Sequence, residues 1–246
     1  MTIETDDAAI DRARNYLIPD LDDNSKIVLF GPAEAEEEGG AAIAPATISS
    51  IFLVYMRIND DGTFAANQYF YQGNGTALDP SLDEMKHGCV GAIAKDMILH
   101  ARTRSSKPNY AYIGQGLDDI KFPSYRSYCV FMFDDEYWKF LVDPSCRPVV
   151  TFLKEKNSNT YEDHPNAFND RRLATFQMTN TTTGKITARQ AAVMTNTMKN
   201  KHNKDLGDKE EEKFCFDLWM RIKYAHSTNG VTLIIDPTGG NLGPPK

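Results

Sequence analysis

The sequence predicts an α+β fold: a predominantly antiparallel, sandwich-like β-structure with several hairpins and one main packed helix near residues 81–103. Three observations lead to this prediction. Two long runs, residues 48–58 and 214–224, are rich in β-branched and aromatic side chains, and the second alternates apolar with mostly polar residues. Aromatic residues make up 11% of the 246-residue chain, which favours pleated sheets. One segment combines a helix-capping pattern with an apolar stripe at helical spacing.

The N-terminal part of the chain is predicted to form an acidic arm over residues 1–46. A short helix is expected to end near residue 18. Residues 25–30, Ser-Lys-Ile-Val-Leu-Phe, predict a strand that Gly31-Pro32 closes. The mixture of Glu, Ala, Gly and Pro over residues 33–46 is typical of a surface loop.

Hairpins dominate the centre of the chain. Residues 48–58 and 64–71 predict two strands joined by the turn sequence Asn-Asp-Asp-Gly. Residues 125–133 and 137–142 predict a second hairpin around an acidic turn. Shorter strands are expected at residues 149–153 and 173–178.

The main helix is predicted from Ser81 and Glu84, which have the spacing of a capping box. Behind them an apolar residue recurs every four positions, at Met85, Cys89, Ile93, Met97 and Ala101. A second, weaker helix is expected over residues 185–198, with Thr187 as its cap.

The C-terminal part is predicted as a strand at residues 214–224 that turns at Asn229-Gly230 and pairs with residues 231–235. Residues 237–246 are rich in Gly and Pro and are expected to form a short tail. No interdomain linker is evident, so we expect residues 1–246 to form a single β-rich domain.

Charge is distributed very unevenly along the chain. Residues 1–40 hold eleven carboxylates against three basic side chains, a net charge of −8, whereas the whole chain carries −7. Residues 171–213 are predicted as a basic excursion rich in Thr and Asn. Within it, residues 171–204 contain no acidic side chain and seven basic ones: Arg171, Arg172, Lys185, Arg189, Lys199, Lys201 and Lys204.

These two tracts suggest a non-enzymatic binding or self-assembly protein with a role in electrostatic contacts between subunits or with a partner protein. A head-to-tail contact between two different patches would produce rings or filaments. The alternative is a nucleic-acid-binding coat or packaging subunit, in which the seven basic residues contact phosphates.

A hydrolase is the third alternative. Cys146 precedes Arg147 and could be activated by His164, and acidic residues at 134–136 and 143 could supply a catalytic carboxylate pair. Cys89 falls on the apolar stripe, so we expect it to have a packing role.

The remaining motifs point away from cofactors and membranes. The five histidines and four cysteines lack the spacing of metal ligands, and we expect no metal, no cofactor and no identifiable small-molecule ligand. The sequence shows neither a secretory signal nor an apolar run long enough to cross a bilayer. Scattered cysteines without a signal predict reduced thiols and a cytoplasmic location.

Overall fold

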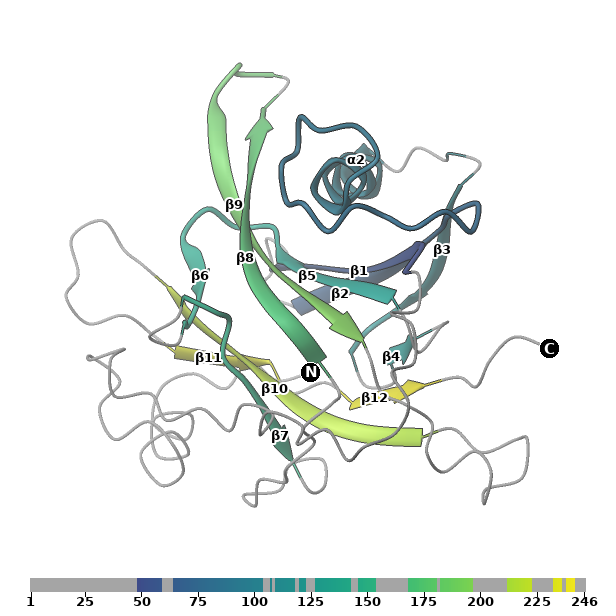
Figure 1. Ribbon diagram of the computed structural model, residues 1–246. Coiled ribbons are helices and arrows are strands. Elements are labelled where there is room, and N and C mark those ends of the chain that lie inside the picture. The colour runs from purple at the N-terminus through teal and green to yellow at the C-terminus, as the bar shows by residue number, and fades with distance from the viewer. Residues whose placement is uncertain are drawn as a thin grey trace.

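The computed structural model of the protein describes residues 48–58, 64–103, 107, 109–117, 120–122, 127–142, 146–153, 168–180, 182–196, 212–222, 232–235 and 238–241. These residues form strands and one helix, with the following bounds: β1 Ser50–Ile58, β2 Phe64–Gln72, α2 Val90–Thr103, β3 Tyr110–Gln115, β4 Ile120–Phe122, β5 Ser127–Phe133, β6 Trp138–Phe140, β7 Val150–Leu153, β8 Phe168–Thr179, β9 Ile186–Asn196, β10 Glu212–Ile222, β11 Thr232–Ile235 and β12 Thr238–Asn241. The β-rich α+β class predicted from the sequence is confirmed (Figure 1).

The first sheet has six strands in the order β3-β2-β1-β5-β9-β8. The predicted hairpin of β1 and β2 is confirmed, with Ser50 opposite Gln72 and Ile58 opposite Phe64. Strands β1 and β5 are parallel, and all other neighbours in this sheet are antiparallel. The hairpin of β8 and β9 extends beyond the rest of the sheet, beside α2 (Figure 1).

The second sheet is built around β10. Strands β11 and β12 pair with two successive stretches of β10, as do β6 and β7. The pairing of β11 with β10 was predicted and is confirmed. Strand β12 begins within the segment predicted as a Gly/Pro tail, and it also pairs in parallel with β4.

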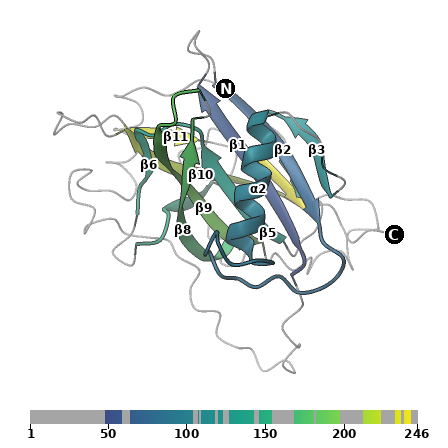
Figure 2. The ribbon, with the colours of Figure 1, turned by 90° about the horizontal axis from the view of Figure 1, so that it is seen from above.

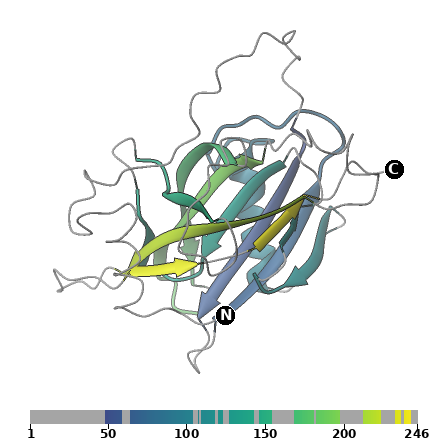
Figure 3. The same cartoon turned by 90° about the horizontal axis from the view of Figure 1, so that it is seen from below.

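The two sheets and α2 form three layers. Viewed from above, α2 lies across the first sheet (Figure 2), and viewed from below, β10 crosses the opposite face (Figure 3). Between the sheets lies an apolar core that includes Phe52, Phe131 and Phe216. A second core, between the first sheet and α2, includes Leu53 and Val130. Consecutive residues of β1 and β5 therefore face different cores, which explains why both strands are almost continuously apolar.

Helix α2 begins at Val90, nine residues later than the capping box predicted. Gly88 has a φ of +76°, a left-handed conformation that interrupts a helix, and Met85 is 85% exposed. The buried face is Val90, Gly91, Ala94, Met97, Ile98 and Ala101. With 14 residues, α2 is too short to cross a bilayer, and no longer apolar helix occurs in the described ranges.

The predicted helix over residues 185–198 is wrong, because this segment forms β9. Strand β9 lies between β5 and β8, and residues 191–196 are all buried. Ala192 and Met194 face the core between the sheets, whereas Ala191 and Val193 face α2. A strand buried on both faces lacks the polar alternation by which strands are recognised.

The predicted hairpin of residues 125–133 and 137–142 is also wrong. The two strands form, but both edges of β5 are taken by β1 and β9, and β6 pairs with β10 instead. The acidic segment from Asp134 to Tyr137 therefore leads from the first sheet to the second. Its backbone remains tied to the first sheet, since the Asp134 amide donates to the Met56 carbonyl at 2.7 Å.

Candidate functional site

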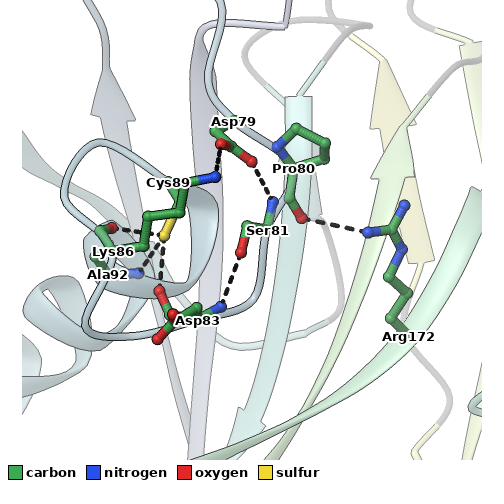
Figure 4. Close-up of polar contacts among 8 residues, drawn as sticks. All are labelled: Asp79, Pro80, Ser81, Asp83, Lys86, Cys89, Ala92 and Arg172. Atoms are coloured by element: carbon green, nitrogen blue, oxygen red, sulfur yellow. Dashed lines mark hydrogen bonds and ion pairs between the residues drawn. The ribbon is translucent and has the colours of Figure 1, made fainter.

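The four basic residues of the predicted anion-binding tract that the structure describes do not share one surface. Arg171 is 5% exposed and donates to the Pro148 carbonyl at 3.5 Å. Arg172 is exposed and donates to the Pro80 carbonyl at 3.3 Å (Figure 4). Lys199, Lys201 and Lys204 lie outside the described residues, as does the acidic arm.

The other two described members of the tract pair with the acidic segment after β5. Lys185 lies 3.3 Å from Glu136, and the Arg189 Nε lies 3.0 Å from Asp134. Each contact is intramolecular, so these cations are already partly neutralised. Anion binding by the seven residues stays a prediction.

Asp134 connects two strands of the first sheet with α2. Besides Arg189 of β9, it accepts a hydrogen bond from the Tyr55 hydroxyl of β1 and lies 3.6 Å from the Arg102 Nε of α2. Burial, together with the Asp134 carboxylate, raises the pKa of Tyr55 well above its ordinary value, so the phenol stays protonated and donates. The network stabilises the docking of the C-terminal end of α2 on the sheet.

The carboxylates proposed for a hydrolase are thus engaged in local structure. Glu136 is paired with Lys185, which holds the pKa of the carboxyl below its ordinary value. Asp135 accepts a hydrogen bond from the Tyr137 amide at 2.7 Å. Asp143 and His164 lie outside the described residues.

The four thiols differ in their exposure to solvent. Cys146 is exposed, with a φ of 59°, whereas Cys89 is fully buried. The Cys89 sulfur lies 2.8 Å from the carbonyls of Asp83 and Lys86, and it accepts from the Ala92 amide at 3.4 Å (Figure 4). It therefore caps the first turn of α2, and its burial agrees with the packing role expected from the sequence.

A groove of about 530 Å³ lies between the exposed flank of α2 and the segment that enters β3. Its apolar lining consists of Tyr71, Ala92, Ile93, Leu99 and Tyr110. Basic side chains line it as well, namely His87, Lys95 and Lys107. The groove can therefore accommodate an apolar group that has an acidic group close by.

Asp96 organises one wall of this groove. Its Oδ2 accepts hydrogen bonds from the Lys107 Nζ and the Tyr110 hydroxyl, both at 2.7 Å. His100, one turn further along α2, lies 3.6 Å from Oδ1 and packs against the Tyr110 ring at 5.4 Å. These contacts attach the start of β3 to α2.

The charge state of this wall follows from its contacts. Burial alone would raise the pKa of Asp96, but the hydrogen bonds from Lys107 and Tyr110 outweigh burial and hold that pKa below its ordinary value. Burial and the Asp96 carboxylate raise the pKa of Tyr110. At neutral pH the wall therefore contains an ionised Asp96 carboxylate and a protonated Tyr110 phenol.

Beside the groove, β3 forms an edge of the first sheet. Among the described strands it pairs only with β2. Tyr110 lies opposite Tyr71, and Tyr112 lies opposite Tyr69, with ring centroids 5.5 and 5.6 Å apart. This tyrosine ladder, Tyr69, Tyr71, Tyr110 and Tyr112, continues the surface on which α2 packs.

The outer end of β3 exposes apolar side chains. Tyr112 is 56% exposed and Ile113 is 40% exposed. A register shift near Gln68 leaves Ile113 without a direct partner on β2, as in a β-bulge. An edge strand with exposed apolar residues is a template on which another extended segment can pair.

Sequence reasoning missed this site, since no strand was predicted at residues 110–115. The available signal was the alternation of Tyr110 and Tyr112, which matches that of Tyr69 and Tyr71. Asp96 and Lys107 could not be linked to it without the fold. Among the described residues, no three His, Cys, Asp or Glu side chains are grouped closely enough to hold a metal ion.

Comparisons of the chain with protein-family models, with curated proteins and with solved structures found no match.

Proposed function

We propose that the protein is a binding protein that pairs the open edge of β3 with an extended segment of a partner polypeptide. The observation that carries this proposal is the edge itself, where Tyr112 and Ile113 are exposed on a strand paired only with β2 among those described. Strand addition supplies affinity through main-chain hydrogen bonds, and adjacent pockets supply specificity through alternate side chains.

The groove beside α2 defines the chemistry of the partner segment. A strand added to β3 would pass the groove at the start of β3, because Tyr110, the first residue of that strand, belongs to the groove lining. The apolar lining suits an aliphatic or aromatic side chain. Lys95 already pairs with Glu84 at 2.9 Å and Lys107 with Asp96 at 2.7 Å. Each lysine has three donor hydrogens, so both can share a further hydrogen bond with a carboxylate close to that side chain in the partner sequence.

Asp96 has a positioning role in this proposal. It holds the Lys107 ammonium and the Tyr110 hydroxyl in place at the beginning of β3. A wall held in place before binding loses less conformational entropy when the partner arrives.

The cellular compartment of the protein is also part of the proposal. The structure describes all four cysteines, and no disulfide bond joins any two of them. Reduced thiols support a reducing compartment, and we propose the cytoplasm.

The test uses a displayed library of random ten-residue peptides selected on the full-length protein. We expect enriched peptides with an apolar residue close to a carboxylate. The double variant Tyr112→Lys/Ile113→Lys should weaken the best peptide at least tenfold, because lysines on an edge strand oppose strand addition. Ile186→Lys is the matched control. Ile186 is 62% exposed on β9, so this change should leave the affinity of the peptide unaltered.

Two results would overturn the proposal. One is a library in which no peptide is enriched over a blank surface. The other is a selected peptide that binds the double variant as tightly as the unmodified protein, while circular dichroism shows the variant folded.

A further inference from the structure

We infer that the edge of β3 is covered within the same molecule by residues 25–30, and that a partner segment binds by displacing them. This inference rests on the proposed function, because it names the segment that competes for the same edge. It makes the N-terminal part of the chain a regulator of binding.

The sequence of residues 25–30 has the chemistry that the edge and groove require. Four consecutive apolar residues, Ile27-Val28-Leu29-Phe30, form a short segment with high β propensity and no proline. Carboxylates lie on both sides of it, at Asp22 and Asp23 before it and at Glu34 and residues 36–38 after it. A single short strand is not stable alone in water and needs a sheet edge.

The two edges of the first sheet differ in what they offer such a segment. Residues 170, 172, 175, 177 and 179 of β8 are exposed, and all of them are polar or charged. At one end of β8, Arg172 also contacts the Pro80 carbonyl. Strand β3 instead exposes Tyr112 and Ile113, so an apolar segment is better matched to β3.

The connection has a favourable geometry. Ser50 at the start of β1 lies opposite Gln72 at the end of β2, and Tyr71 lies opposite Tyr110 at the start of β3. A segment added antiparallel to β3 would end at this same end of the sheet. It would lie three strand spacings from β1, or about 14 Å. The intervening residues 31–49 can span up to about 60 Å.

Charge complementarity supports the same edge. In the antiparallel arrangement, the carboxylates after Phe30 emerge next to the start of β3. Lys107 lies there, three residues before Tyr110, and Lys95 lines the adjoining groove. The reverse orientation would bring Asp22 and Asp23 to the same place, so attraction between opposite charges favours this edge in either orientation.

A linker of this length makes the intramolecular contact hard to outcompete. Short flexible linkers give effective concentrations of about 1 mM. Consider a free peptide of the same sequence that binds the uncovered edge with a Kd of about 100 μM. Its apparent affinity for the unmodified protein would be roughly tenfold weaker than for a protein whose own segment cannot pair with β3.

The experiment compares the full-length protein with Val28→Pro, which removes a backbone donor from the middle of the segment. Ala35→Pro is the matched control, because it places a proline in the same arm outside the segment. The probe is a fluorescent peptide of residues 23–32. Binding is followed by anisotropy, and amide exchange is measured over residues 110–115.

We expect Val28→Pro to bind the peptide about tenfold more tightly than the unmodified protein and Ala35→Pro. Amides in β3 should exchange at least tenfold faster in Val28→Pro. Light scattering should show that the unmodified protein is a monomer near 27.6 kDa. A dimer that Val28→Pro dissociates would overturn the inference, because the segment would then act between molecules.

The two proposals can fail separately. If the peptide binds all three proteins equally, and Tyr112→Lys/Ile113→Lys weakens it in each, the intramolecular contact is refuted and the binding edge stands. If selected peptides bind the double variant as tightly as the unmodified protein, the edge of β3 is refuted as the binding site.

Discussion

Gly91 lies in the first turn of α2, directly against the backbone of Leu82. A Cβ atom at Gly91 would lie 2.3 Å from the Leu82 carbonyl oxygen and 2.4 Å from its carbonyl carbon. The Gly91 amide also donates to the Ser81 carbonyl at 3.0 Å. This close approach fixes the segment before α2, including His87 and Gly88 of the groove.

We predict that Gly91→Ala destabilises the protein, although the same change in an open helix would stabilise it by about 1 kcal/mol. Overpacking of this kind costs about 1–3 kcal/mol. Loss of the hydrogen bond to Ser81 adds about 1 kcal/mol. After the gain in helix propensity is subtracted, the expected loss of unfolding free energy is about 2 kcal/mol.

Urea denaturation followed by tryptophan fluorescence measures this loss, because Trp138 and Trp219 are both buried. In chains of this size such a loss lowers Tm by roughly 4–8 °C. Gly88→Ala is the comparison, since a Cβ there meets no atom within 4 Å and the cost comes from its φ of +76° alone. A Gly91→Ala protein as stable as the original would refute the steric argument.

Three further predictions concern other described residues. Asp134→Asn removes the carboxylate shared by Arg102 and Arg189. Urea denaturation should show a loss of about 1–3 kcal/mol in the free energy of unfolding, which is below the range for fully buried ion pairs. Unchanged stability would contradict the stabilising role of these contacts. The pKa of Asp96 is lowered in the folded state, so its stabilising contribution is complete above the unfolded value of about 3.9 and is lost as pH falls through the lower folded value. Stability measured from pH 2 to 5 should therefore depend less steeply on pH in Asp96→Asn, and an unchanged slope would count against the contact with Lys107. A thiol reagent should modify exposed Cys146 before Cys129, since burial raises the pKa of Cys129 to about 12; early modification of Cys129 would contradict its burial.

The sequence predicted those strands whose pattern or turn is local. Only five residues separate β1 from β2 in the sequence. Residues 216–220 of β10 alternate between apolar side chains of the central core and other residues. The pattern failed for β9, because residues 191–194 face two cores and resemble a weak helix face. The pairing of strands could not be read from the sequence either. β5 and β6 are close in sequence, yet β1 and β9 occupy both edges of β5.

The candidate site was beyond sequence reasoning for a related reason. Asp96 comes from a helix, Lys107 from a connecting segment and Tyr71 from a strand, and only the packing of α2 on the sheet brings them together. The capping box at Ser81 misplaced the start of that helix. In the structure the Ser81 hydroxyl accepts from the Asp83 amide at 3.2 Å within a turn, and the helix begins after Gly88.

The central claim is that β3 receives an extended polypeptide segment along its open edge. The most direct measurement is residue-resolved amide exchange of the Val28→Pro variant, whose own segment cannot cover the edge, with and without a selected peptide. Exchange should slow at least tenfold within Tyr110–Gln115 and stay unchanged in β8, the opposite edge of the sheet. Protection confined to β8, or to no strand of the first sheet, would contradict it.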